Sequence, residues 1–392
     1  MVKGMKQTEI GLIPEDWEVK KLGSIAFITK LAGFEYSKHF NSYKDGGEII
    51  VVRGTNITNN KLDLTDTKYI PRKVSDFLYR SKLSKGDLVF AYVGTIGPIY
   101  LIGENDRFHL GPNTAKIRIE DKDVSTRFIY NYFLSEFIRK EIDDRISVGA
   151  QPSLSMTKIR DFSLPLPPLP EQEAIAGALS DADAWIESLE QLIAKKRLIK
   201  QGAMQDLLTP KEGWEVKKLG DLFEISAGGD LVKYNWNNIP SESYEYEVYS
   251  NSLSNKGLFC FSSEYSSEGN CITVTARGTV GYAVPRFERF LAIGRLLCLK
   301  PKIDLEIRYV SEFINNKISF ANESTGVPQL TAPQISTYEI KIPSLTEQTR
   351  IATILSDMDA ELEALEQQLH KARQIKQGMM QELLTGRVRL EL

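Results

Sequence analysis

The chain has 392 residues, 42% of them hydrophobic, and its 49 Lys and Arg against 52 Asp and Glu give a formal net charge of -3. This length exceeds what one hydrophobic core usually serves, and the balanced charge means that any DNA-binding surface must be a local patch. No stretch approaches eighteen apolar residues, and the N-terminus lacks the apolar core of a signal peptide, so the sequence predicts a cytoplasmic protein of several domains. No cysteines form a C-x-x-C pair, which predicts neither disulfide bonds nor a metal site.

Residues 1–168 are expected to form a first globular domain. It opens with the motif WEVKKLG at 17–23, and short β-rich runs follow between residues 48 and 119. A helical pattern at 127–142 has an apolar face that includes Phe128, Tyr132 and Phe137. Strands followed by a late helix predict a mixed α/β or α+β domain.

The polar loop at 53–61, with the sequence RGTNITNNK, is the main binding candidate in this domain. Arg and Asn side chains bind the edges of guanine and adenine in a bidentate manner. A solvated turn is the simpler explanation for any one of these residues, but as a set they favour binding. The candidate DNA contacts are Tyr36, Lys38, Arg53, Thr55, Asn56, Asn59, Asn60 and Lys61.

A helix of nearly forty residues is expected at 169–209. It follows a proline-rich stretch and has Glu171 in its first turn, where the helix dipole favours negative charge. Its apolar residues alternate in spacings of four and three, which is the pattern of a coiled-coil seam. The seam positions are Ile175, Leu179, Ile186, Leu189 and Ile193. Such a helix is on the order of 55 Å long.

Residues 210–344 are expected to form a second domain on the same plan. WEVKKLG recurs at 214–220, GTVG at 278–281 echoes GTIG at 94–97, and a late helical pattern recurs at 308–318. Both GTxG motifs could bind a phosphate through backbone N–H groups, although a turn between strands is the simpler interpretation. Between these shared motifs the two domain sequences differ, which predicts the same fold in both domains with two different binding surfaces. The candidate DNA contacts here are Lys233, Asn235, Trp236, Asn237, Asn251, Lys256 and Arg277.

The last segment, 345–392, repeats the first helix. In the alignment of 345–385 with 169–209, 25 of the 41 positions are identical. Its seam is expected at Ile351, Leu355, Leu362, Leu365 and Leu369. Because the first helix leads from one domain to the other, the second packs on it most simply by running back, which predicts an antiparallel pair with pseudo-two-fold symmetry. Gly202 and Gly378 occupy the same place in both copies, which suggests a close helix crossing or a partner contact.

Catalytic motifs are missing from the chain. It has no phosphate-binding P-loop, no H-E-x-x-H, no G-x-S-x-G and no N/D-P-P-Y/F motif of an adenine methyltransferase. The three histidines are scattered, so none is expected to act as a base or ligand. The sequence therefore predicts a chain with no catalytic residues and no metal.

The repeated P-L-x-EQ-x-x-I and LSD-x-D patterns, the KQG-x-MQ-x-LLTG ending, the W-x-x-x-x-LG motif and the G-T-x-G turn together resemble the specificity subunit of type I restriction-modification systems. The resemblance covers the whole chain. It implies two target-recognition domains separated by two antiparallel coiled-coil helices, each domain reading one half of a bipartite, asymmetric DNA site.

The resemblance also implies partners and cofactors. Such subunits bind no cofactor themselves; they assemble with two modification subunits, which use S-adenosylmethionine, and with restriction subunits driven by ATP and Mg. The main alternative is a self-sufficient DNA methyltransferase or nuclease with its own recognition domains. A coiled-coil scaffold without a DNA role leaves the polar loops of both domains unexplained.

Overall fold

The computed structural model describes residues 4–33, 45–147, 152–231, 234–320 and 329–390. The chain divides into two compact units: unit 1 comprises Met1–Leu189 and Gln368–Leu392, and unit 2 comprises Glu190–Gln367. Each unit therefore contains one globular domain together with part of both long helices. The sequence predicted a division into four consecutive segments, whereas the contacts join each domain to the helix segments that pack on it.

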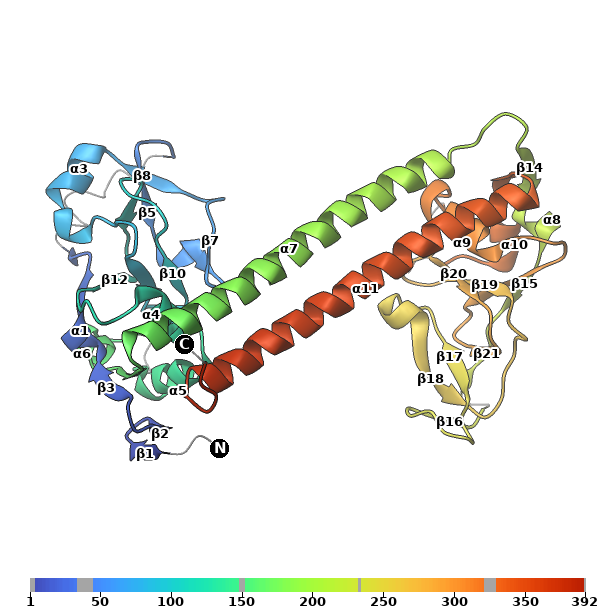
Figure 1. Cartoon of the computed structure of the whole chain (residues 1–392). Coiled ribbons are helices and arrows are strands. Elements are labelled where there is room, and N and C mark those ends of the chain that lie inside the picture. Colours follow the sequence, from blue (N-terminus) through green and yellow to red (C-terminus); the bar gives the residue numbers. More distant parts are fainter. Residues whose placement is uncertain (1–3, 34–44, 148–151, 232–233, 321–328, 391–392) are drawn as a thin grey trace. The chain divides into compact units, whose positions relative to one another are not determined.

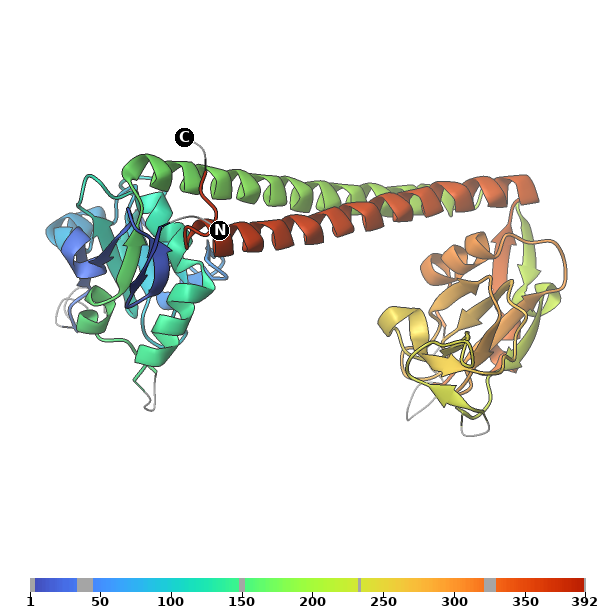
Figure 2. The same ribbon diagram turned by 60° about the horizontal axis from the view of Figure 1, so that its bottom comes forward.

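The two long helices are α7, Leu169–Leu207, and α11, Leu345–Leu383, each of 39 residues. Within each unit they lie side by side and run in opposite directions (Figures 1 and 2). The seam residues Ile175, Leu179, Leu189, Ile193, Ile351 and Leu355 are buried, whereas Ile186, Leu362, Leu365 and Leu369 are partly exposed. The predicted helices and their antiparallel pairing are confirmed.

The first domain is built from small sheets and short helices. Its principal sheet has the order β10-β9-β12-β4, and a second sheet has the order β11-β5-β8, in which β11 and β5 are parallel. The strands are β1 (Met5–Thr8), β2 (Gly11–Pro14), β3 (Glu18–Lys21), β4 (Ala26–Lys30), β5 (Ile49–Val52), β6 (Ile57–Thr58), β7 (Lys61–Leu62), β8 (Lys68–Ile70), β9 (Leu88–Ala91), β10 (Ile99–Leu101), β11 (Phe108–Leu110), β12 (Thr114–Ile119) and β13 (Ser163–Leu166). The helices are α1 (Leu22–Ile25), η1 (Gly54–Asn56), α3 (Arg72–Phe77), η2 (Tyr79–Ser81), α4 (Thr126–Phe133), α5 (Glu136–Arg145) and α6 (Met156–Arg160).

The second domain repeats this topology. Its sheets have the orders β15-β22-β19-β20 and β16-β18-β17-β21, and β17 and β21 are again parallel. The strands are β14 (Glu215–Lys218), β15 (Phe223–Ala227), β16 (Trp236–Asn237), β17 (Tyr246–Tyr249), β18 (Leu258–Ser262), β19 (Cys271–Val274), β20 (Ala283–Arg286), β21 (Phe290–Ala292), β22 (Leu297–Pro301) and β23 (Glu339–Ile342). The helices are α8 (Leu219–Leu222), η4 (Ser254–Gly257), α9 (Ile307–Lys317) and α10 (Ala332–Ser336). The principal sheets match in strand order, which confirms the shared plan and makes β10 the equivalent of β20, while the second sheet of this domain has the additional edge strand β16.

The repeated Glu-Gln motif attaches each long helix to its own domain. The amide of Gln172 donates to the carbonyl of Pro167 at 2.8 Å and accepts from Ser125 N, at the start of α4, at 2.8 Å. Gln348 makes the same contacts in the second copy, with Pro343 at 2.9 Å and with Glu306, at the start of α9, at 3.1 Å. Both glutamines are buried, and buried amides need hydrogen-bond partners. The motif therefore makes the same pair of hydrogen bonds in each domain.

The long helices complete the core of each unit. Leu383 and Leu384 of the α11 end pack in the first core with Trp17, and Leu208 after α7 packs in the second core with Leu219. Burying such side chains contributes about 1.5–3 kcal/mol each. Cys260, Cys271 and Cys298 are also buried and free, as small core residues are expected to be.

The GTxG motifs are turns between strands, joining β9 to β10 and β19 to β20. Gly97 has a φ of 113° and donates its N–H to the carbonyl of Ala91; Gly281 has a φ of 93° and donates to Thr275. This confirms the structural interpretation. In contrast, nothing lies within 4 Å of a Cβ built on Gly202 or Gly378, so the predicted close helix crossing at these glycines is wrong for the described residues.

Candidate nucleic-acid interface

In the loop after β5, the two polar side chains best suited to binding bases form hydrogen bonds within the loop. The buried Asn56 amide donates to the carbonyls of Asp63 at 3.0 Å and Asp66 at 2.8 Å, and its oxygen accepts from Arg53 Nε at 3.0 Å. The Arg53 guanidinium also pairs with the Asp66 carboxylate at 2.9 Å. These contacts make Asn56 and Arg53 supports of the loop, and their role as base contacts stays a prediction.

Replacing Asn56 by alanine should destabilise the first domain. The change leaves the Asp63 and Asp66 carbonyls without their buried donor, a loss of about 1–3 kcal/mol. We expect a lower thermal unfolding temperature, with Thr55→Ala as the matched control because Thr55 is exposed on the same loop. An unchanged unfolding temperature combined with altered base preference would instead restore Asn56 as a base contact.

The residues that follow form a tight turn. Asn59 and Asn60, with φ values of 51° and 58°, join β6 to β7 in the two-residue hairpin geometry that requires left-handed backbone. Asn60 is held in place because its Oδ1 accepts from Ile99 N at 3.0 Å. Asn59, Thr55 and Lys61 are exposed on the surface of this loop.

In the second domain, the predicted residues at 235–237 lie at a sheet edge. Trp236 and Asn237 form the short strand β16, which pairs with β18, and the Trp236 side chain is 44% exposed. The Asn235 backbone carbonyl accepts from Ser262, which fixes the approach to this strand, and the Asn237 side chain accepts from Ile239 N. An exposed aromatic at an edge is suited to stacking or packing against a ligand.

Asn251 and Arg277 have different environments. The Asn251 amide donates to the Gly294 carbonyl and accepts from Ala276 N, both at 2.6 Å, so it joins two loops, and its DNA contact stays a prediction. Arg277 is exposed next to the GTVG turn, on the backbone that pairs with Gln329. Tyr36, Lys38 and Lys233 lie outside the described residues.

Lys256 lies on an unusual backbone conformation. Asn255 and Lys256 have φ values of 47° and 50° inside η4, and Gly257 follows with a φ of 90°. Left-handed backbone is rare for residues other than glycine and asparagine and costs on the order of 1–3 kcal/mol at each such position. Both side chains are exposed.

Arg286, the last residue of β20, holds this loop through hydrogen bonds of its side chain. It is 8% exposed, its Nε donates to Thr273 Oγ1 at 3.0 Å, and its Nη2 donates to the Lys256 carbonyl. Its guanidinium lies 3.4 Å from the ring centroid of Tyr249. No carboxylate forms an ion pair with it in the part of the chain that the structure describes, and burial lowers the pKa of Arg286.

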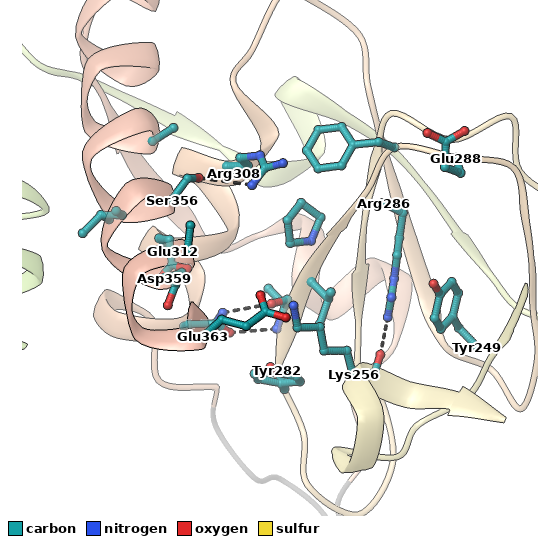
Figure 3. A pocket seen from close by; sticks show the side chains of 18 of the residues that line it. Tyr249, Lys256, Tyr282, Arg286, Glu288, Arg308, Glu312, Ser356, Asp359 and Glu363 are labelled. Atoms are coloured by element: carbon teal, nitrogen blue, oxygen red, sulfur yellow. Dashed lines mark hydrogen bonds between the residues drawn. The ribbon is translucent and has the colours of Figure 1, made fainter. Parts of the chain in front are cut away.

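Arg286 and Lys256 line one side of a groove of about 1000 Å³ within unit 2, and α9 and α11 line the other (Figure 3). Its cationic residues are Lys200, Lys256, Arg286, Arg289 and Arg308, and its anionic residues are Glu247, Glu288, Glu312, Asp359, Glu363 and Glu366. Burial raises the pKa of Glu312. Because Glu312, Asp359, Glu363 and Glu366 line the helix side, the groove itself is poorly suited to a phosphate backbone.

The paired helices carry the same ion pair twice. Lys376 Nζ lies 2.5 Å from Asp183 in unit 1, and Lys200 Nζ lies 2.5 Å from Asp359 in unit 2. In both, the Asp comes from the LSD-x-DA motif and the Lys from the KQG motif. The recurrence of these motifs therefore reflects an antiparallel register that is the same in both units.

Reversing one charge should loosen the pair, and reversing both should restore it. Asp359→Lys places two cations in contact and should destabilise unit 2 by about 1 kcal/mol, while adding Lys200→Asp should recover most of that loss. Thermal unfolding of the two single variants and the double variant measures the coupling. Equal unfolding temperatures for Asp359→Lys and the double variant would show that the pair does not set the register.

Other kinds of site are not found among the described residues. They contain no group of three or more His, Cys, Asp or Glu placed to hold a metal ion. No helix within these ranges is long and apolar enough to cross a membrane.

The sequence analysis missed Arg286, because the sequence does not distinguish a buried arginine at a strand end from a surface arginine. It also missed the cross-helix ion pairs, although the signal was present. The Asp and Lys positions are identical in both copies of the repeat, and charges conserved between copies can pair with one another.

The comparisons with known proteins agree with these observations. The family model described as type I restriction modification DNA specificity domain matches twice, at 14–196 and 211–374. A specificity subunit assigned to the type I restriction enzyme MjaX of Methanocaldococcus jannaschii is 27% identical, over 99% of this chain and 97% of that protein.

Two solved structures share the fold. The S subunit of a type I restriction-modification system from M. genitalium aligns over 96% of both chains, with a TM-score of 0.61 and 15% identity. A chain from a structural study of complex assembly in the type I system aligns with a TM-score of 0.56 and 16% identity, over 96% of this chain and 99% of that one. With two copies of the specificity domain covering most of its length, the chain belongs to the type I restriction-modification DNA specificity family, whose members are DNA-recognition subunits rather than enzymes.

Proposed function

We propose that each globular domain of this chain reads one half of a bipartite, asymmetric DNA sequence. The observation that carries the proposal is one fold built twice with different surfaces. The order of the principal sheet, the GTxG turns and the glutamine contacts are the same in both domains, while the loops after β5 and β17 differ in sequence. A repeated frame with two different polar loops suits two different half-sites.

The paired helices then connect the two recognition domains and bind the partner subunits. We propose two modification subunits, which use S-adenosylmethionine, and restriction subunits, which use ATP and Mg, acting together in the cytoplasm. The chain itself takes no cofactor in this scheme. The structural neighbour from the study of type I complex assembly supports this scheme.

Mapping adenine methylation across the genome tests the proposal directly. Cells that carry the gene should methylate one bipartite motif with two unrelated halves, and cells that lack it should not. A matched strain lacking a modification subunit should lose the same motif. A bipartite motif that persists without this gene would contradict the proposal.

The isolated chain should neither methylate nor cut DNA, nor hydrolyse ATP, because it has none of the sequence motifs for these reactions. Assays on a preparation free of partner subunits measure this, with the assembled complex as positive control. Methyl transfer or binding of S-adenosylmethionine by the isolated chain would favour the alternative, a self-sufficient methyltransferase.

A further inference from the structure

Each recognition domain carries a short tip with left-handed backbone, on which Asn59 and Lys61 in one domain and Asn255 and Lys256 in the other are exposed. The first tip is Asn59-Asn60-Lys61, between β6 and β7, and the second tip is Asn255-Lys256-Gly257, in η4. Each tip has two consecutive non-glycine residues with φ between 47° and 58°. Each follows the equivalent strand, β5 or β17, that lies beside a parallel neighbour.

The two tips are also anchored to equivalent strands, although at opposite ends of them. The first is held by Ile99 N, which donates to Asn60 Oδ1 at 3.0 Å, and Ile99 begins β10. The second is held by Arg286, which donates to the Lys256 carbonyl and ends β20. Since β10 and β20 are equivalent strands, each following its GTxG turn, the conserved hairpin supports a different tip in each domain.

The anchors are unrelated in chemistry, although they do the same thing. One is a backbone N–H binding a side-chain amide, and the other is a buried guanidinium binding a backbone carbonyl. Each domain thus presents an exposed Asn and an exposed Lys at an anchored left-handed turn, with Lys61 directly after the turn and Lys256 within it. Backbone of this kind persists only where the surrounding structure holds it.

We propose that the two tips are equivalent base-reading elements, Asn59 and Lys61 for one half-site and Asn255 and Lys256 for the other. This inference rests on the proposed function and specifies the residues that perform it. An Asn amide can pair with adenine in the major groove, and a Lys ammonium can bind guanine or a phosphate. Asn60 and Arg286 act as positioning residues, because they hold the tips and are not themselves presented to DNA.

Glycine substitutions separate the side chain from the backbone. Lys256→Gly removes the ammonium group, but glycine adopts left-handed backbone at no steric cost, so the fold should be as stable as before or more stable. In the first domain, Asn59→Gly removes the side-chain amide and leaves the left-handed backbone in place. Lys218→Ala is the matched control, since Lys218 is an exposed lysine on β14, in the same domain as Lys256 but on another strand.

The experiment uses the complete chain assembled with its modification subunits and reads the methylated motif genome-wide, together with the thermal unfolding temperature. Lys256→Gly should lower discrimination at one or two positions of one half-site by roughly ten- to a hundredfold and leave the other half-site unchanged. Asn59→Gly should affect only the opposite half-site. Lys218→Ala should alter neither.

Arg286→Lys tests the positioning role. It keeps the positive charge and is expected to relax the half-site that Lys256→Gly affects. In binding assays on the assembled complex, the salt dependence should stay unchanged, because no phosphate contact is removed. A purely structural Arg286 would lower the unfolding temperature without changing base preference.

Three outcomes would overturn these assignments. An unchanged motif in both glycine variants would show that the tips do not read bases, while the proposed function would stand. Equal loss at both half-sites from one variant would contradict the division between the tips. A wild-type complex with no bipartite motif would overturn the proposed function itself, on which the inference depends.

Discussion

A shortened chain of residues 1–209 should form a homodimer that directs methylation to a palindromic site. It contains one recognition domain and α7, whose apolar seam cannot stay exposed in a stable monomer. An identical copy can cover that seam, because α7 and α11 carry nearly the same residues. A protein two-fold axis then imposes matching symmetry on the DNA site.

The contacts within each unit predict how two copies of the shortened chain pack against each other. In the alignment of the two helix copies, Lys200 corresponds to Lys376 and Leu208 to Leu384. Lys200 of one copy would therefore reach Asp183 of the other, as Lys376 does in unit 1. Leu208 would fill the core position of Leu384, since both leucines are fully buried in their own units.

One contact would be missing from the homodimer. Arg389, in the tail after α11, pairs with Asp16 at 2.8 Å and with Glu171, which is 2% exposed. A half-protein that continues after Thr209 with the sequence of 386–392, GRVRLEL, should restore this pairing. We expect it to unfold at a higher temperature than the chain ending at 209, because a buried carboxylate without its partner is costly.

Sedimentation and genome-wide methylation measure the outcome. The homodimer is expected at micromolar concentration, and its motif should contain the first half-site twice in inverted orientation. A folded monomer would contradict the dimer. Methylation of the original asymmetric site by the half-protein would contradict the assignment of one half-site to each domain.

Adding one heptad to both long helices should lengthen the spacer between the half-sites. Seven residues add about 10 Å of helix, which is close to three base pairs of duplex rise. The insertions belong between Leu189 and Glu190 and between Gln367 and Gln368, where the two units divide. The ion pair between Asp183 and Lys376 and the pair between Lys200 and Asp359 then remain intact within their units.

The spacer of the methylated motif measures this effect. A matched control with four residues inserted in both helices breaks the heptad register and should lower the unfolding temperature. DNA bending could absorb part of a 10 Å change at a cost of a few kcal/mol, seen as slower methylation. Full activity at an unchanged spacer would show that the helices do not set the distance.

The sequence by itself determined the architecture, because repeats and periodicity are local signals. The 25 identities between the two copies and the four-three spacing of Ile175, Leu179 and their successors were enough to predict two long antiparallel helices. The GTxG glycines predicted turns for the same reason, since left-handed backbone is a property of single residues. Packing, which the sequence does not show, joins each domain to parts of both long helices.

Only the tertiary structure decided which polar side chains are available to a ligand. Asn56, Asn59, Asn251 and Asn255 have the same chemistry in the sequence, yet Asn56 and Asn251 bond backbone groups of neighbouring loops. Asn59 and Asn255 instead stand exposed on anchored turns. The difference depends on carbonyls and N–H groups brought near by other parts of the chain, and a buried amide such as that of Asn56 is hydrogen-bonded to them.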